Sequence, residues 1–237
     1  MTIVPPYKVK SAYESLFGAF RRTVEDANRE LFPGTIQLKF AKSSNTEAVF
    51  EGCLYLKDWP CRKTPKKSRV DVVIKAMETF SVGSWSLTKS TVYLNYFVVS
   101  EDTAYLVQSL HYDFQGGGQT NHPFFHVQLT DEPIDPGDLA KAGFVLALKP
   151  CRRLRQRQIM TKIPTPDMTL CSVLYCLVAD HLEGGFLAQL AESVDPIQGR
   201  LPLLSFDALS ASLKKYPAHF KSSHWFAHTL KAREKKN

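Results

Sequence analysis

The chain has 237 residues, 44% of them hydrophobic, and carries a formal net charge of +7 with a pI near 9.1. This length favours one large domain with a helical appendage, and the apolar content is ample for a packed core. No run of about eighteen uninterrupted apolar residues occurs, and residues 1–10 lack the apolar core of a secretory signal. We therefore expect a cytoplasmic protein that has no membrane partner.

The first predicted element is an amphipathic helix. Apolar residues recur at three- and four-residue intervals from Ala12 to Leu31, and Pro33-Gly34 ends the pattern. Strand-like segments follow at residues 35–41, 47–57, 70–76, 90–99, 103–114 and 124–129, separated by turn-forming or charged stretches. Together these segments predict a mainly antiparallel central sheet.

The pattern changes after Asp131. Prolines and a glycine at residues 133–137 predict a connector, and residues 144–148 predict one more buried strand. Thr165-Pro166 has the capping residue and first-turn proline that open a helix, and the apolar stripe of that helix runs to His181. We interpret His181 as a hydrogen-bonded core or interface histidine. Further helices are expected at residues 186–193, 206–216 and 222–235.

The predicted fold class is α+β, with an N-terminal helix, a central mainly antiparallel sheet and an α-rich C-terminal third. Residues 1–132 would supply the helix and the sheet, and residues 133–237 a basic strand and the helical region. We expect the two regions to pack as one compact unit.

A candidate catalytic site lies on either side of the glycines at 116–118, which favour a hairpin turn. Strand alternation places His111 and Asp113 on one face of the first strand, and gives the polar residues of the return strand a common parity. The candidate residues are His111, Asp113, His122, His126 and Gln128. The sequence leaves the register open, and a slip of one residue would separate the two polar sets.

Two chemistries fit this cluster. Neutral imidazoles and a carboxylate could hold a divalent metal such as zinc, manganese or iron, which would activate water. Without a metal, histidines could act as general base and general acid on a phosphodiester while Asp113 orients one ring. A third interpretation is a hydrogen-bonded polar face with no catalytic role. The spacing matches no closed zinc signature, so the identity of any metal stays open.

Positive charge is concentrated in two segments, which predicts an anionic partner. The candidate nucleic-acid-binding residues are Arg62, Lys63, Lys66 and Lys67 in the first, and Arg152, Arg153, Arg155, Arg157 and Lys162 in the second. If the second segment is extended, Arg153, Arg155 and Arg157 share one face at a spacing near that of successive phosphates. The alternative is an edge strand protected by charge.

Several familiar signatures are missing. The chain has no phosphate-binding P-loop, no dinucleotide-binding glycine pattern and no G-x-S-x-G nucleophile elbow. Its five cysteines are odd in number and form no C-x-x-C pair, which argues against a disulfide scaffold. Nucleotide-driven and dehydrogenase functions are correspondingly disfavoured.

Three segments in order, His111-Tyr-Asp113, His122-Pro-Phe-Phe-His126-Val-Gln128 and Ile163-Pro-Thr-Pro166, carry a resemblance to a known group. The chain resembles an uncharacterised group of bacterial proteins with H-x-D, H-P-x-x-H-x-Q and I-P-T-P segments. The resemblance implies a bacterial source and an association with mobile-element or phage-defence genes, and it implies no particular activity.

Two functions remain open. The first is a nucleic-acid-binding module of a bacterial defence or toxin–antitoxin system, which contacts the phosphate backbone through the basic strand and has RNA, DNA or a protein as partner. The second is a phosphodiesterase or nuclease that uses the cluster at 111–128, with or without a divalent metal. The sequence does not decide whether the protein is an enzyme.

Overall fold

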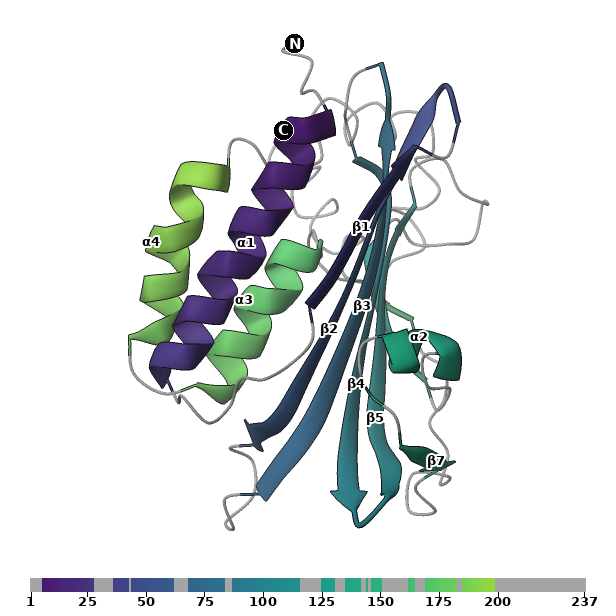
Figure 1. Ribbon diagram of the computed structural model, residues 1–237, viewed down its shortest axis with the longest axis vertical. Coiled ribbons are helices and arrows are strands. Elements are labelled where there is room, and N and C mark those ends of the chain that lie inside the picture. Colours follow the sequence, from purple (N-terminus) through teal and green to yellow (C-terminus); the bar gives the residue numbers. More distant parts are fainter. Residues whose placement is uncertain are drawn as a thin grey trace, which may run out of the picture.

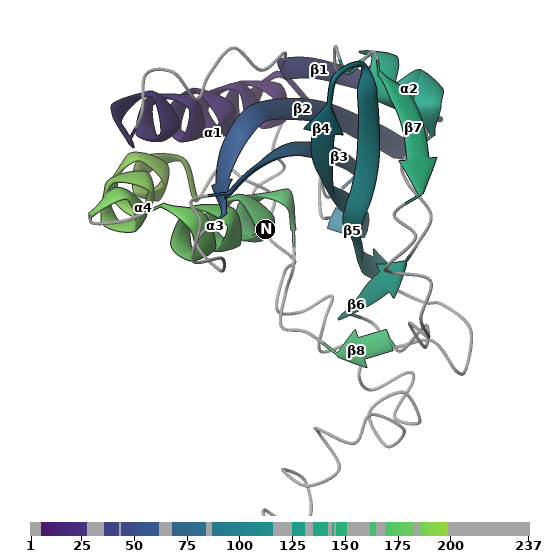
Figure 2. The same ribbon diagram turned by 90° about the horizontal axis from the view of Figure 1, so that it is seen from below.

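A computed structural model describes residues 6–27, 36–42, 44–61, 68–83, 87–115, 125–130, 135–141, 144, 146–150, 162–164, 169–182 and 185–198. Helices α1 (Pro6–Ala27) and α3 (Leu170–His181) cover one face of a sheet, and helix α4 (Phe186–Gln198) packs on both of them on the side away from the sheet (Figures 1 and 2). The short helix α2 (Pro136–Lys141) lies on the other face of the sheet. The predicted α+β class is confirmed. None of the described helices combines the length and hydropathy needed to span a bilayer.

The sheet is an antiparallel meander of long strands with two short additions at one edge. Its strands are β1 (Ile36–Lys42), β2 (Glu47–Cys61), β3 (Ser68–Ser81), β4 (Leu87–Ser100), β5 (Thr103–Gln115), β6 (Phe125–Thr130), β7 (Ala147–Pro150) and β8 (Lys162–Pro164). Strands β1 to β6 pair in chain order, β8 pairs antiparallel with β6, and β7 pairs parallel with the first residues of β5. The six predicted strands of the meander are present, and the strand predicted at 144–148 begins later, at Ala147.

The main core lies between the sheet and the three helices. Helix α1 begins at Pro6, ahead of the predicted start, because proline is tolerated in a first turn. Its apolar residues, spaced three and four apart, are buried: Val9, Ala12, Tyr13, Leu16, Phe17, Phe20 and Val24. The Tyr13 ring stacks on Phe50 of β2 with centroids 3.7 Å apart. Residues of α3 and α4 belong to the same cluster, so the helical region packs on the sheet.

Helix α3 begins at Leu170, five residues after the predicted start at Thr165. Its N-cap residue Thr169 makes no side-chain capping hydrogen bond. Instead, the buried Glu78 carboxylate of β3 accepts a hydrogen bond from the backbone N–H of Leu170 at 2.9 Å. A carboxylate is favourable at a helix N-terminus because the first N–H groups lack partners within the helix. A residue 92 positions away therefore fixes the start of the helix, which local sequence cannot show.

His181 ends α3 and joins it to the sheet. Its Nδ1 donates to the carbonyl oxygen of Pro60 at 2.8 Å, and the Tyr96 hydroxyl lies 3.4 Å from its Nε2. Its ring also lies against Trp59. The prediction of a hydrogen-bonded interface histidine is confirmed.

A second, smaller core lies on the opposite face of the sheet. Phe144 packs edge-on against Tyr55 and against Phe97, while Leu139 of α2 is buried in the same cluster. The predicted connector thus contains a short helix that covers apolar residues of β3, β4 and β5. Among the residues that the structure describes, this cover extends over the part of the sheet near the β4–β5 turn, and polar residues follow on the same face beyond Tyr93.

We predict that the protein loses stability between about pH 10 and 12. Burial is the largest cause that raises the pKa of Tyr112 to about 12, and the nearby Cys176 and Asp180 add to it. Burial and the nearby Glu78 carboxylate raise the pKa of Tyr13 well above its ordinary value of 10.0. Both phenols are therefore harder to ionise in the folded than in the unfolded chain, and their stabilising contribution is complete below pH 10 and declines above it. Urea unfolding at a series of alkaline pH values, with phenolate absorbance followed in parallel, tests this. An unfolding free energy that rises with pH in that window would contradict it.

Candidate functional site on the open sheet face

The register of β5 and β6 brings the two predicted polar sets together. His111 pairs with Gln128, and Asp113 pairs with His126. Residues directly opposite one another in an antiparallel pair lie on the same face of the sheet. The register that the sequence left open therefore places all four positions on one face, opposite the helices α1, α3 and α4.

The structure describes the predicted residues of this cluster to different extents. The side chains of His111, Asp113 and Gln128 are described and all are half-buried. His126 is placed by its backbone in β6, but its side chain lies outside the described part, and His122 lies wholly outside it. Neighbouring Gln115 ends β5 and is likewise placed by its backbone alone.

His111 and Asp113 form the centre of the site. The His111 Nε2 atom lies 3.2 Å from Asp113 Oδ1, and the two side chains are 22% and 18% exposed. Thr91 of β4, which pairs with Asp113, donates its hydroxyl to the same Oδ1 at 2.7 Å. The Thr91 hydrogen bond holds the carboxylate in one orientation, and the His111 imidazole lies within ion-pair distance of it. Such a pair can accept a proton or bind a polar ligand.

Tyr93 completes the centre on the β4 side. Its ring stacks on the His111 imidazole with centroids 4.4 Å apart and planes 11° from parallel. Burial and the nearby Asp113 raise the pKa of Tyr93, and Lys75 acts in the opposite direction, so the phenol stays a neutral hydrogen-bond donor at physiological pH. Sequence reasoning missed Thr91, Tyr93 and Lys75. For Tyr93 and Lys75, each of which lies between two buried neighbours, strand alternation was the available signal; Thr91 is itself buried and gave no such signal.

One cross-strand row runs through the site. Lys75 pairs with Tyr93, Tyr93 with His111, and His111 with Gln128, from β3 to β6. In β8, Lys162 pairs with Gln128 and so occupies the next position of this row, although its side chain lies outside the described part. Because every step is a direct antiparallel pair, the described row residues lie on one face.

The predicted basic segment is anchored at both ends to the sheet edge that carries this site, and its Lys162 end is the nearer of the two. Its arginines Arg152, Arg153, Arg155 and Arg157 lie outside the described residues. The strand before them, β7, ends at Pro150 opposite Leu106, and the strand after them, β8, starts at Lys162 opposite Gln128. Both anchors belong to the β5–β6 edge of the sheet. The chain thus enters and leaves the basic segment at the edge that carries His111 and Asp113.

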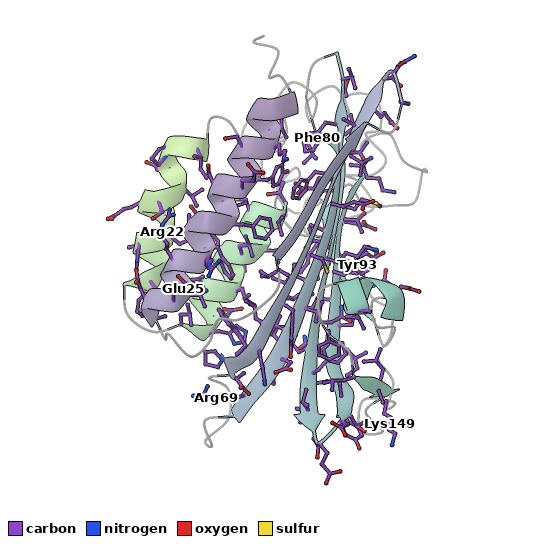
Figure 3. The ribbon with its side chains drawn as sticks, viewed as in Figure 1. Arg22, Glu25, Arg69, Phe80, Tyr93 and Lys149 are labelled. Carbon is purple, nitrogen blue, oxygen red and sulfur yellow. The ribbon has the colours of Figure 1, made fainter. Side chains whose placement is uncertain are left out.

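The other basic segment is anchored far from this site. Arg62, Lys63, Lys66 and Lys67 lie outside the described residues, between the paired ends Cys61 and Ser68. Ser68 precedes Lys75 by seven residues of β3, or about 23 Å of extended strand. Figure 3 shows the adjacent Arg69 at the far end of the sheet from Tyr93. We therefore assign this segment no part in the same site.

Among the described residues, no group of three or more His, Cys, Asp and Glu side chains is arranged to hold a metal ion. His111 and Asp113 supply two groups of the right chemistry. The other two histidines of the sequence-predicted metal site, His122 and His126, have side chains outside the described residues.

No protein-family model, curated protein or solved structure shows a significant match to this chain. The function is therefore inferred from the geometry and charge of the site.

Proposed function

We propose that this protein binds nucleic acid on the open sheet face, with the phosphate backbone held by the basic segment between β7 and β8. The observation that carries the proposal is the register at the β5–β6 edge. It brings the end of the basic segment, at Lys162, into one cross-strand row with Gln128 and His111.

The basic segment and the open sheet face are both chemically complementary to a nucleic acid. Guanidinium groups match phosphate oxygens in a two-pronged geometry, and the chain carries an excess of positive charge of +7. The open face adds an amide at Gln128, an imidazole at His111 and a phenol at Tyr93, which can hydrogen-bond to bases or sugars. Phosphate contacts would supply affinity, and the face would supply selectivity. The resemblance to bacterial proteins near defence genes supports a place in such a system.

The His111–Asp113 contact favours phosphodiester cleavage as a second candidate function. In that reaction His111 takes a proton from water while the water oxygen bonds to phosphorus and the ester P–O bond breaks. The departing oxygen takes a proton from solvent or a second imidazole. Asp113, fixed by Thr91, would stabilise the charged imidazole that forms.

One experiment addresses both functions. Purified protein is titrated with labelled RNA and DNA at a series of salt concentrations, and the same samples are analysed for cleavage with and without added Mn²⁺ or Zn²⁺. We expect binding whose logarithm falls linearly with the logarithm of salt concentration, because phosphate contacts release counterions. Absence of salt-dependent binding would refute the binding proposal. Cleavage that disappears in His111→Asn, while binding persists, would establish the second candidate function.

A further inference from the structure

We infer that the ligand is single-stranded nucleic acid, which crosses the strands along the row formed by Lys75, Tyr93, His111 and Gln128. This inference rests on the proposed function. It specifies the class of nucleic acid and names Lys75 as the end of the binding surface away from the basic segment. Lys75 belongs to neither basic segment. It is part of the site because the strand register pairs it with Tyr93, which in turn pairs with His111.

The row presents different groups in a fixed order. Lys75 provides an ammonium on β3, Tyr93 and His111 provide stacked rings on β4 and β5, and Gln128 provides an amide on β6. Adjacent strands lie about 4.8 Å apart, so the row extends over about 14 Å. This length accommodates a few nucleotides. A cation at one end and hydrogen-bonding groups beside it suit a phosphate followed by exposed bases.

The shape of the surface favours a single strand over a duplex. All four side chains are half-buried, so they do not project far above the sheet. In a B-form duplex the base edges lie at the floor of grooves about 8.5 Å deep and 12 Å wide, which admit a helix or a two-stranded ribbon. A face four strands wide cannot enter such a groove, whereas unpaired bases can reach it.

The second core limits where the strand can lie. Tyr93 packs at the border of the cluster that contains Leu139 and Phe144, so α2 and its neighbouring residues close the face on one side of the row. On the other side lie Thr91 and Asp113. A ligand that follows the row therefore has the second core beside Tyr93 on one flank and the Asp113 carboxylate on the other.

The test compares one sequence as single-stranded RNA, single-stranded DNA and duplex, by fluorescence anisotropy with wild type and Lys75→Gln. We expect each single strand to bind at least tenfold more tightly than the duplex. Lys75→Gln should weaken single-strand binding about five- to tenfold and reduce the salt slope by about 0.7, which corresponds to one phosphate. Tyr93→Leu should weaken it about tenfold, and Tyr93→Phe should retain part of the affinity because the ring remains.

Arg22→Gln is the matched control, because it removes the same charge from the exposed surface of α1, on the other side of the sheet from Tyr93 (Figure 3). Its affinity should stay within twofold of wild type. Equal or tighter binding of the duplex, or an equal effect of Lys75→Gln and Arg22→Gln, would overturn the inference while the proposed function stands. Failure of the wild type to bind any of the three probes would overturn the proposed function itself.

Discussion

Replacing Glu78 by alanine should lower the free energy of unfolding by about 3–6 kcal/mol. The Glu78 carboxylate, 1% exposed, accepts hydrogen bonds from the Tyr13 hydroxyl, the Ser90 hydroxyl and the Leu170 N–H. These donors come from α1, β4 and the first turn of α3. Alanine removes their common acceptor inside the core, and each buried donor without a partner costs about 1–3 kcal/mol. Urea unfolding followed by circular dichroism measures the loss.

Glu51→Ala provides the matched control, because Glu51 is an exposed carboxylate on the neighbouring strand β2. Its effect should stay within about 0.5 kcal/mol, as for most surface substitutions. Hydrogen exchange locates the effect: the first-turn amides of α3 should lose more protection in Glu78→Ala than those near His181. Similar losses in the two variants, or uniform exchange along α3, would contradict the assigned role of Glu78.

The long strands and α1 were predictable because their burial follows simple periodicities. Apolar residues alternate along β2 to β5 and recur every three or four residues in α1, so the local sequence of each element predicts which of its faces is buried. The start of α3 was not predictable in this way. Thr165-Pro166 is a good local helix signal, but the N-terminus forms where Glu78 of β3 can cap it. A contact across 92 residues outweighs the local pattern.

The candidate site was predictable in part for the same reason. Alternation along β5 is sufficient by itself to place His111 and Asp113 on one face of the strand. Their partners depend on how neighbouring strands align, and a shift of one residue would exchange Tyr93 for a buried neighbour. Lys75 and Tyr93 can therefore be assigned to the row only when the strand register is known. The described residues likewise show that the two basic segments are anchored at different places on the sheet.

The second large effect is expected from the basic segment. Combined replacement of Arg153, Arg155 and Arg157 by glutamine should weaken single-strand binding roughly a hundredfold at low salt, because each exposed charged contact contributes about 1 kcal/mol. The slope of log K against log salt should become shallower by about 2, since each lost phosphate contact on a single strand removes about 0.7. Anisotropy titrations over a range of salt concentrations measure both quantities.

A second triple variant separates local contact from general charge. Lys231, Arg233 and Lys235 have the same alternate spacing near the C-terminus, and replacing them by glutamine lowers the formal charge from +7 to +4, as the arginine variant does. If binding depends on contacts of the segment between β7 and β8, only the arginine variant shows the hundredfold loss of affinity and the reduced salt slope. Equal losses in both would mean that long-range attraction by the whole chain accounts for the binding, because net charge alone is then sufficient. The role of the segment would then have to be abandoned, whereas a selective loss places the phosphate backbone at the edge where Lys162 meets Gln128.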